Sequence, residues 1–153
     1  MCRNITFICG LCGIALLMTA CPMDYDVILR MENRSNHNLY MCPLGTDTLF
    51  YKRYVDFYVI PRKDTVRLSL GGRGNFEAKY REWKADTLSF MFLDNDTLVK
   101  YGWDYMRRNY RVLVRYDLSL DDINFLRETL TYPPTPAMQD MKMYPPYSTH
   151  FFE

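Results

Sequence analysis

The stretch YRVLVRYDL, residues 110–118, decides the fold class because its apolar and charged side chains alternate. Successive strand residues point to opposite faces of a sheet, so this alternation predicts a half-buried strand. The apolar face carries Tyr110, Val112, Val114, Tyr116 and Leu118. The other face carries the charged Arg111, Arg115 and Asp117. We therefore expect one face to cover a core and the other to meet water.

The same period of two recurs in four further segments, which are separated by polar turns. Their predicted inward residues are Tyr25, Val27, Leu29 and Met31; Val55, Phe57 and Val59; Val66, Leu68 and Leu70; and Leu88, Phe90 and Phe92. The aromatic content of 16%, with 13 Tyr, also favours strands. Together the five segments predict a mainly β fold, a single sandwich-like antiparallel domain over residues 25–132. The alternative is an α+β fold.

One or two short helices are expected near the C-terminal half. Trp103, Met106 and Tyr110 recur at i, i+3 and i+7, the spacing of one helix face, and Asn109 suits the end of that helix. A second helix is predicted to begin after Ser119, whose hydroxyl can cap its first turn. Its apolar stripe runs on to the paired prolines, through Ile123, Leu126 and Leu130.

The first twenty residues have the pattern of a secretory signal. Arg3 supplies positive charge, and the apolar run after it stops short of the roughly 20 residues that a membrane span needs. The run ends in LMTAC, residues 17–21, which resembles the lipobox of bacterial lipoproteins with Met where Leu is usual. That resemblance implies cleavage before Cys21 and lipid on its sulfur, with residues 21–24 as a short linker. The alternatives are a plain signal peptide and an uncleaved anchor.

Removal of residues 1–20 changes both the charge balance and the thiol content. It deletes one Arg and no acid, so the remaining 133 residues carry 18 basic and 18 acidic side chains. This balance gives no electrostatic basis for binding nucleic acid, and we expect no such partner. With Cys21 lipidated, Cys42 is the one remaining thiol and an internal disulfide is excluded. A lone cysteine of this kind is typical of a small buried hydrophobic residue.

Residues 133–153 form a tail of different composition, which holds five of the eight prolines. No period is sustained there, so we expect an extended tail or a strap across the domain. Met138, Met141, Met143 and His150 offer thioethers and an imidazole, the soft ligands that select Cu(I). This set is a weak metal candidate beside the simpler interpretation, apolar packing of the tail, and no cofactor is expected.

The chain offers little material for catalysis. Its two histidines are His37 and His150, no Gly-x-Ser-x-Gly elbow is present, and Cys42 has no base near it in sequence. A glycosidase needs two carboxyls that face each other about 5–10 Å apart. Here neighbouring carboxylates have turn-like or capping contexts, at Asp94/Asp96 and Asp121/Asp122. We therefore expect no enzyme, with a hydrolase acting on envelope or glycan material as the alternative.

Several short motifs stand out between residue 86 and about residue 147. They are DTLSF, the pair Tyr101-x-Trp103, RYDLS at residues 115–119 and two Tyr-Pro-Pro repeats. With the lipobox, these motifs resemble a group of small, uncharacterised lipoproteins of Bacteroidales-type bacteria, whereas residues 22–85 match that group only loosely. The resemblance implies an exported, lipid-anchored protein and no particular substrate.

Asp-Thr followed by Leu or Val occurs four times, at Thr48, Thr65, Thr87 and Thr97. The resemblance implies that these threonines are candidates for O-glycosylation, because exported proteins of such bacteria are modified at Asp-Ser/Thr before an aliphatic residue. The alternative is structural, since Asp favours turns, Thr favours strand starts, and the apolar residue then begins the buried face. Both interpretations hold together if the turns are exposed.

These features predict an exported, lipid-anchored binding or structural module at the cell envelope. The lipid would hold it to the cell membrane or outer membrane, on a side that the sequence does not assign. A glycan or an envelope protein is the expected partner, with candidate contacts at Trp83, Tyr101, Trp103 and Tyr105. At Trp103 core packing is the stronger interpretation, because this residue begins an apolar helix stripe. Assembly into a pilus is a minor alternative.

Overall fold

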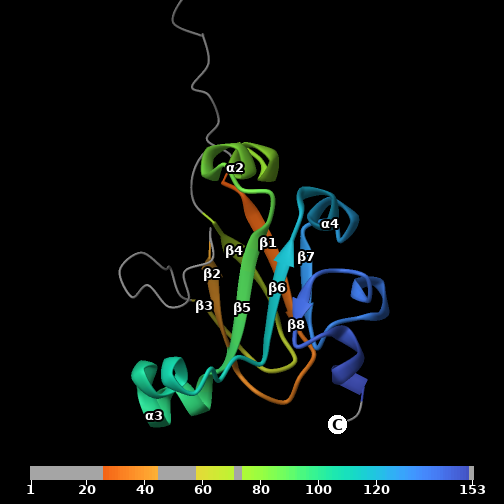
Figure 1. The fold of residues 1–153 in the computed structure, drawn as a ribbon. Helices are drawn as coiled ribbons and strands as arrows, with labels where there is room; N and C mark the ends of the chain where they lie inside the picture. The colour runs from red at the N-terminus through yellow and green to blue at the C-terminus, as the bar shows by residue number, and fades with distance from the viewer. Residues whose placement is uncertain (1–25, 45–57, 71–73, 152–153) are drawn as a thin grey trace, which may run out of the picture.

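The computed structural model describes residues 26–44, 58–70 and 74–151, whose arrangement is shown in Figure 1. These residues form eight strands and three α-helices. The strands are β1 (Ile28–Asn33), β2 (Leu39–Leu44), β3 (Tyr58–Ile60), β4 (Thr65–Ser69), β5 (Leu88–Asp94), β6 (Val114–Leu118), β7 (Thr129–Tyr132) and β8 (Met143–Tyr144). The helices are α2 (Phe76–Trp83), α3 (Asn95–Arg108) and α4 (Leu120–Phe125).

The strands are arranged in two sheets that pack against each other (Figure 1). The three-stranded sheet has the order β4-β1-β7, and the five-stranded sheet has the order β3-β2-β5-β6-β8. Neighbouring strands are antiparallel, except that β1 and β7 run parallel. The prediction of a mainly β, sandwich-like domain is confirmed, and the parallel pair departs from the all-antiparallel expectation.

The main core lies between the two sheets. Leu29 of β1 and Phe90 and Phe92 of β5 point into it and are at most 1% exposed. Burying a side chain of this size contributes about 1.5–3 kcal/mol. Tyr116 of β6 is also fully buried, and its hydroxyl donates a hydrogen bond to the Thr131 carbonyl of β7 over 2.8 Å. This bond joins one sheet to the other through the core.

Strand β5 is buried on both faces, whereas the sequence predicts burial on one. Its outward residues Ser89, Met91 and Leu93 are at most 5% exposed. Met91 and Leu93 belong to a second, smaller core cluster, which is completed by Cys42, Leu98 and Met106. The last two residues come from α3. The prediction of a one-sided sheet is therefore wrong at β5, because α3 covers part of the outer face.

Strand β3 faces the opposite way from the prediction. Val59 is 53% exposed, whereas Ile60 is fully buried. The register explains this, because Ile60 pairs with Leu39 of β2, which itself points into the main core. Val55 and Phe57, the other residues of the predicted inward face, lie outside the described residues.

The helices differ from prediction at their beginnings. Helix α2 was not predicted, and Asn75 caps it by accepting a hydrogen bond from the Ala78 amide over 3.0 Å. Helix α3 begins eight residues before the predicted start at Trp103, and Asp94 caps it by accepting from the Thr97 amide over 2.6 Å. The turn-like context predicted at Asp94 is thus a helix cap. Asn109 ends α3 as predicted.

The second predicted helix begins as expected but is much shorter. Ser119 caps α4 and forms a reciprocal capping box with Asp122. The helix ends at Phe125, and Leu130, predicted to lie on its apolar stripe, lies in β7 opposite Met31 of β1. The predicted continuation to the paired prolines is therefore wrong. Residues 129–132 pair with β1 as a strand, although their apolar spacing also fits a helix.

The tail contributes to both the core and the five-stranded sheet. It contains two short 3-10 helices, η2 (Pro136–Met138) and η3 (Tyr147–Phe151), on either side of β8. Met138 is fully buried in the main core. Strand β8 pairs with β6, which places Tyr144 opposite Arg115.

Candidate functional site

Helix α3 lies at the end of the molecule where β5 leads into it (Figure 1). Residues of this helix and of the segments around it line a groove of about 460 Å³. Three kinds of residue line it. The rings are Tyr101, Tyr105 and Tyr110; the apolar residues are Met106, Val112 and Leu113; and the polar residues are Asp94, Thr97, Asn109 and Arg111. We call this concavity the tyrosine groove.

Two of the tyrosines come from α3, which is broken between them. Gly102 has φ 75° and ψ 170°, a conformation that interrupts the helix and is essentially restricted to glycine. The rings of Tyr101 and Tyr105 stack across the break with centroids 4.7 Å apart. Tyr101 is 50% exposed, and the Lys100 ammonium lies 4.9 Å from the centre of its ring. The pair therefore presents an aromatic surface to the groove.

The third tyrosine is placed by the turn that ends α3. The Asn109 side-chain amide donates to the Tyr105 carbonyl over 2.9 Å, and the Arg111 amide donates to the Met106 carbonyl over 3.0 Å. Between them, Tyr110 adopts a φ of 44°. A positive φ is uncommon for a bulky residue, so these bonds hold an unfavourable backbone conformation.

Tyr110 does not belong to the strand in which the sequence placed it. Strand β6 begins at Val114, and the Tyr110 ring instead meets Tyr144 of β8 edge-on with centroids 5.5 Å apart. Val112 likewise packs against the second core cluster rather than the main core. The predicted alternation is therefore wrong for residues 110–113, because this part of the chain closes the end of α3 before it enters the sheet.

Two contacts hold the carboxylate of Asp94, one of the polar residues of the groove. One carboxylate oxygen caps α3 at the Thr97 amide, and the other lies 3.4 Å from Nδ1 of His37. Arg111 is exposed and forms no ion pair within the described part of the chain. The groove thus offers a hydrogen-bond acceptor at Asp94, a donor at Arg111 and both kinds of group at Asn109.

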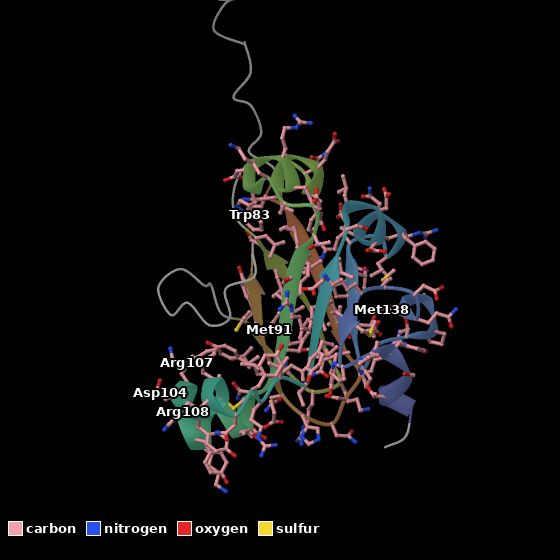
Figure 2. The ribbon with its side chains drawn as sticks, in the orientation of Figure 1. Trp83, Met91, Asp104, Arg107, Arg108 and Met138 are labelled. Carbon is pink, nitrogen blue, oxygen red and sulfur yellow. The ribbon has the colours of Figure 1, made fainter. Side chains whose placement is uncertain are left out.

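The structure separates the four aromatic residues predicted as contacts. Tyr101 and Tyr105 line the groove, whereas Trp103 packs against the second core cluster and meets Tyr40 edge-on at 5.4 Å. Trp83 packs against the main core from α2, with the Lys79 ammonium 5.2 Å from its ring. Figure 2 shows Trp83 at the opposite end of the molecule from the labelled residues of α3, Asp104, Arg107 and Arg108.

Eight of the ten groove residues were not among the predicted contacts, which included only Tyr101 and Tyr105 of this set. Sequence spacing could relate Tyr101 to Tyr105, because residues four apart share a helix face. Asp94 precedes the helix, and Tyr110 and Arg111 follow it across a turn, so no simple period relates these residues to the pair. Only the return of the chain past the helix end brings them to one concavity.

The candidate glycosylation threonines have different settings. Thr65 is exposed at the start of β4, and Thr87 is half-buried directly before β5, so both lie at strand entries. Thr97 lies in the first turn of α3, so the strand-entry interpretation is wrong for that triplet. Thr48 lies outside the described residues.

The methionines of the tail lie against the main core. Met138 is fully buried, and Met141 and Met143 are half-buried beside it. The side chain of His150, the fourth member of the weak copper candidate, lies outside the described part. Within residues 26–44, 58–70 and 74–151, no group of three or more His, Cys, Asp or Glu side chains is placed to hold a metal ion.

The N-terminal features lie elsewhere. The predicted signal, residues 1–20, and Cys21 with its linker are outside the described residues. Among the helices of the described part, none is both long and apolar enough to cross a membrane.

Comparison with models of protein families, with curated proteins and with solved structures finds no match to this chain.

Proposed function

We propose that this chain is an exported, lipid-anchored module that binds a glycan at the cell envelope through the tyrosine groove. The observation that carries the proposal is the convergence of three tyrosine rings and four polar residues on one concavity of about 460 Å³. A sugar ring presents apolar C–H faces together with hydroxyl groups. It is therefore bound best where aromatic surface and hydrogen-bonding groups occur side by side.

Four groove residues have a specific role in this proposal. The Tyr101 and Tyr105 rings supply surface for a sugar face, and their stacking limits the conformational entropy lost on binding. The Asp94 carboxylate keeps acceptor capacity beyond the bond from Thr97. The Arg111 guanidinium supplies hydrogen-bond donors for sugar hydroxyl oxygens. A volume of about 460 Å³ lies within the range of about 300–1,000 Å³ that is typical of small-ligand sites.

The groove lies at the end of the domain that faces away from the proposed lipid anchor, and this position supports binding outside the bilayer. The chain enters β1 at the end of the domain that carries α2, and α3 lies at the opposite end (Figure 1). A lipid on Cys21, seven residues before β1 begins, would hold the α2 end towards the membrane. The tyrosine groove would then be presented to material outside the bilayer.

A hydrolase acting on envelope or glycan material is the alternative function. Such an enzyme needs two carboxyls across the scissile bond. Asp94 is the one carboxylate among the described residues that line the groove, and it already caps α3. The groove therefore favours binding over hydrolysis.

The test is the binding of neutral oligosaccharides, first on an array and then in solution, by the full-length chain in non-ionic detergent. Tyr101→Ala and Tyr105→Ala should each weaken binding at least tenfold, about 1.4 kcal/mol, because each removes a ring from the groove. Phe125→Ala is the matched control, since Phe125 is an aromatic residue of α4 that is 68% exposed and outside the groove. This variant should bind within twofold of the wild type.

Two outcomes would contradict glycan binding by the groove. One is that no oligosaccharide is retained, and the other is that the tyrosine variants bind as well as the control. If reducing sugar is released during the incubation, and Asp94→Asn abolishes the release, the hydrolase is the better proposal.

The proposed lipid anchor and glycosylation are tested separately, by mass spectrometry of native protein from membranes beside a Cys21→Ala variant. Diacylglycerol on Cys21 and hexose-rich masses on Thr48, Thr65, Thr87 or Thr97 are the expected result. An unmodified chain, uncut or cut at another residue, would contradict the lipid anchor.

A further inference from the structure

A charged concavity lies on the outer face of the three-stranded sheet and shares no residue with the tyrosine groove. Its volume is about 420 Å³. Three arginines line it, Arg30 of β1, Arg67 of β4 and Arg127 from the turn before β7. The other lining residues are Ile28, Glu128 and Thr129. We call the three arginines the arginine triad.

Two members of the triad face each other across strands. Arg30 of β1 is the direct antiparallel partner of Arg67 of β4. Directly opposed residues on one sheet face have their Cβ atoms about 4.5–5.5 Å apart, and like charges in such a pair destabilise the sheet. Both side chains are exposed, so the pair does not contribute to the core.

Among the described residues, no carboxylate forms an ion pair that would offset this repulsion. Glu128 lines the same concavity but forms no ion pair with any of the three guanidinium groups in the part of the chain described. Glu32, the next outward residue of β1, is occupied by Arg34, whose guanidinium lies 2.9 Å from its carboxylate. The concavity therefore holds three positive charges and one negative charge.

The third arginine is brought to this face by an unusual turn. Arg127 and Glu128 have φ values of 50° and 56°, a region that bulky residues seldom adopt. The Arg30 amide donates to the Glu128 carbonyl over 2.8 Å, and the Glu128 amide donates to the Ile123 carbonyl over 2.9 Å. These bonds fix the turn beside β1, so that Arg127 joins Arg30 and Arg67 at one concavity.

We propose that the arginine triad is a binding site for a phosphate group. The planar guanidinium fork matches the spacing of phosphate oxygens and binds them with charge-assisted hydrogen bonds. The net charge of +2 from three arginines and Glu128 is complementary to an anionic phosphate group, which would also relieve the repulsion between Arg30 and Arg67. This site stands independently of the glycan groove.

Two sources could supply the phosphate, a soluble phosphorylated molecule or a lipid headgroup. Arg30 lies nine residues after Cys21, which is at most about 30 Å of extended chain. A headgroup is therefore within reach of the triad if Cys21 carries lipid. The experiment has one arm for each source.

The first arm measures thermal unfolding of the full-length chain in neutral detergent, in inorganic phosphate and in sodium chloride at equal ionic strength. Phosphate should raise the unfolding temperature of the wild type. Arg30→Gln and Arg67→Gln should weaken phosphate binding at least fivefold. Arg62→Gln, which alters an exposed arginine in the turn before β4, is the matched control and should respond as the wild type does.

A second readout separates a binding site from a structural role. In chloride alone, Arg67→Gln should unfold at the same temperature as the wild type or a higher one, because the substitution removes a like charge opposite Arg30. A lower unfolding temperature in chloride, with an unchanged response to phosphate, would overturn the proposal.

The second arm replaces phosphate with mixed micelles that contain phosphatidylglycerol, compared with phosphatidylcholine. A rise in unfolding temperature with phosphatidylglycerol, absent in Arg67→Gln, would identify a lipid headgroup as the source. A rise with inorganic phosphate but not with this lipid would identify a soluble ligand. No triad-dependent rise in either arm would overturn the site.

Discussion

At the scale of single residues, the Cys42 thiol lies in a buried, apolar environment. It lies on the outer face of β2, is 3% exposed and belongs to the second core cluster with Met91 and Leu93. Burial raises the pKa of its thiol to about 12. Because the thiolate is the nucleophilic form, this cysteine behaves as a small hydrophobic residue at neutral pH.

The raised pKa of Cys42 predicts a loss of stability in alkali. Well below the ordinary thiol pKa of 9.0 the thiol is protonated in both the folded and the unfolded chain, so its contribution is complete there. Between about pH 9 and 12 the unfolded chain loses the proton first. The free energy of unfolding therefore falls, by up to about 1.4 kcal/mol per pH unit from this group.

Urea unfolding of the wild type and Cys42→Ala at pH 7.5, 9.5 and 10.5, in reducing buffer, tests this expectation. The variant should start less stable at pH 7.5, because it leaves a small cavity. Its stability should then decline less steeply with pH than that of the wild type. Parallel declines would mean that the thiol is not shielded from water.

Asp117 holds the outer face of the five-stranded sheet together at the tail. It is 7% exposed and accepts hydrogen bonds from Ser89 of β5 over 2.5 Å and from Arg115 over 2.6 Å. Its amide donates to the carbonyl of Lys142, directly before β8, over 2.9 Å. A carboxylate this enclosed needs such partners to offset its lost hydration.

Asp117→Asn should lower the free energy of unfolding by about 1.5–3 kcal/mol, because it removes the negative charge that the Arg115 guanidinium and the Ser89 hydroxyl bind. Urea unfolding at pH 7 measures the change. Asp140→Asn is the control, because Asp140 is exposed in the tail, and it should change stability by less than about 0.5 kcal/mol. Equal effects of the two substitutions would contradict a structural role for the network.

At the scale of elements, the break in α3 shapes the tyrosine groove. Beyond the neighbouring residues and the backbone of its own helix, no atom lies within 4 Å of a Cβ built on Gly102, so space alone would allow a larger residue. The backbone does not, because φ 75° with ψ 170° is essentially a glycine conformation. The glycine therefore lets the helix turn between Tyr101 and Trp103, so that one ring lines the groove and the other packs inward.

Gly102→Ala should lower the free energy of unfolding by about 1–3 kcal/mol, all of it from backbone strain. It should also weaken oligosaccharide binding, because relief of the strain reorients Tyr101. Urea unfolding and the binding assay measure the two effects. Val99→Ala, at an exposed site of the same helix, is the control and should leave both unchanged. An unchanged or raised stability in Gly102→Ala would show that the break is not required.

The elements themselves were predictable where one period governs the segment. Leu29 and Met31 in β1, and Phe90 and Phe92 in β5, face the main core as their alternation indicates. Helix α2 also carries a sequence signal, since Phe76, Tyr80 and Trp83 recur at i, i+4 and i+7 after the capping residue Asn75. Local periodicity is reliable in these segments because burial follows it.

Other elements depend on partners that lie far away in sequence. Leu130 fits a helical spacing from Ile123, yet Arg127 and Glu128 leave the helix and the chain pairs with β1. The tyrosine groove has the same origin, because Asp94 and Arg111 line one concavity only through the packing of α3 against β2 and β5. Sequence spacing could indicate the pair Tyr101 and Tyr105 but could not give their polar neighbours.

At the scale of the whole molecule, the C-terminal tail supplies both an edge strand and a core residue of the domain. Strand β8 forms the edge of the five-stranded sheet beside β6, and η2 inserts Met138 into the core between the sheets. Pro134 is buried next to this segment in sequence. Unfolding of the tail therefore exposes part of the main core, and we expect the tail and the sandwich to unfold as one cooperative unit.

Met138→Ala tests this expectation. The substitution should lower the free energy of unfolding of the whole domain by about 2–5 kcal/mol, because it leaves a cavity in the main core. Met141→Ala is the matched control and should cost less, since Met141 is only half-buried. Tryptophan fluorescence, which reports Trp83 and Trp103 far from the tail in sequence, should shift together with far-UV circular dichroism in a single transition.

If the midpoints of these probes stay unchanged in Met138→Ala, the tail is a separable strap. If Cu(I) raises the wild-type midpoint but not that of Met138→Ala, the methionines are metal ligands rather than core.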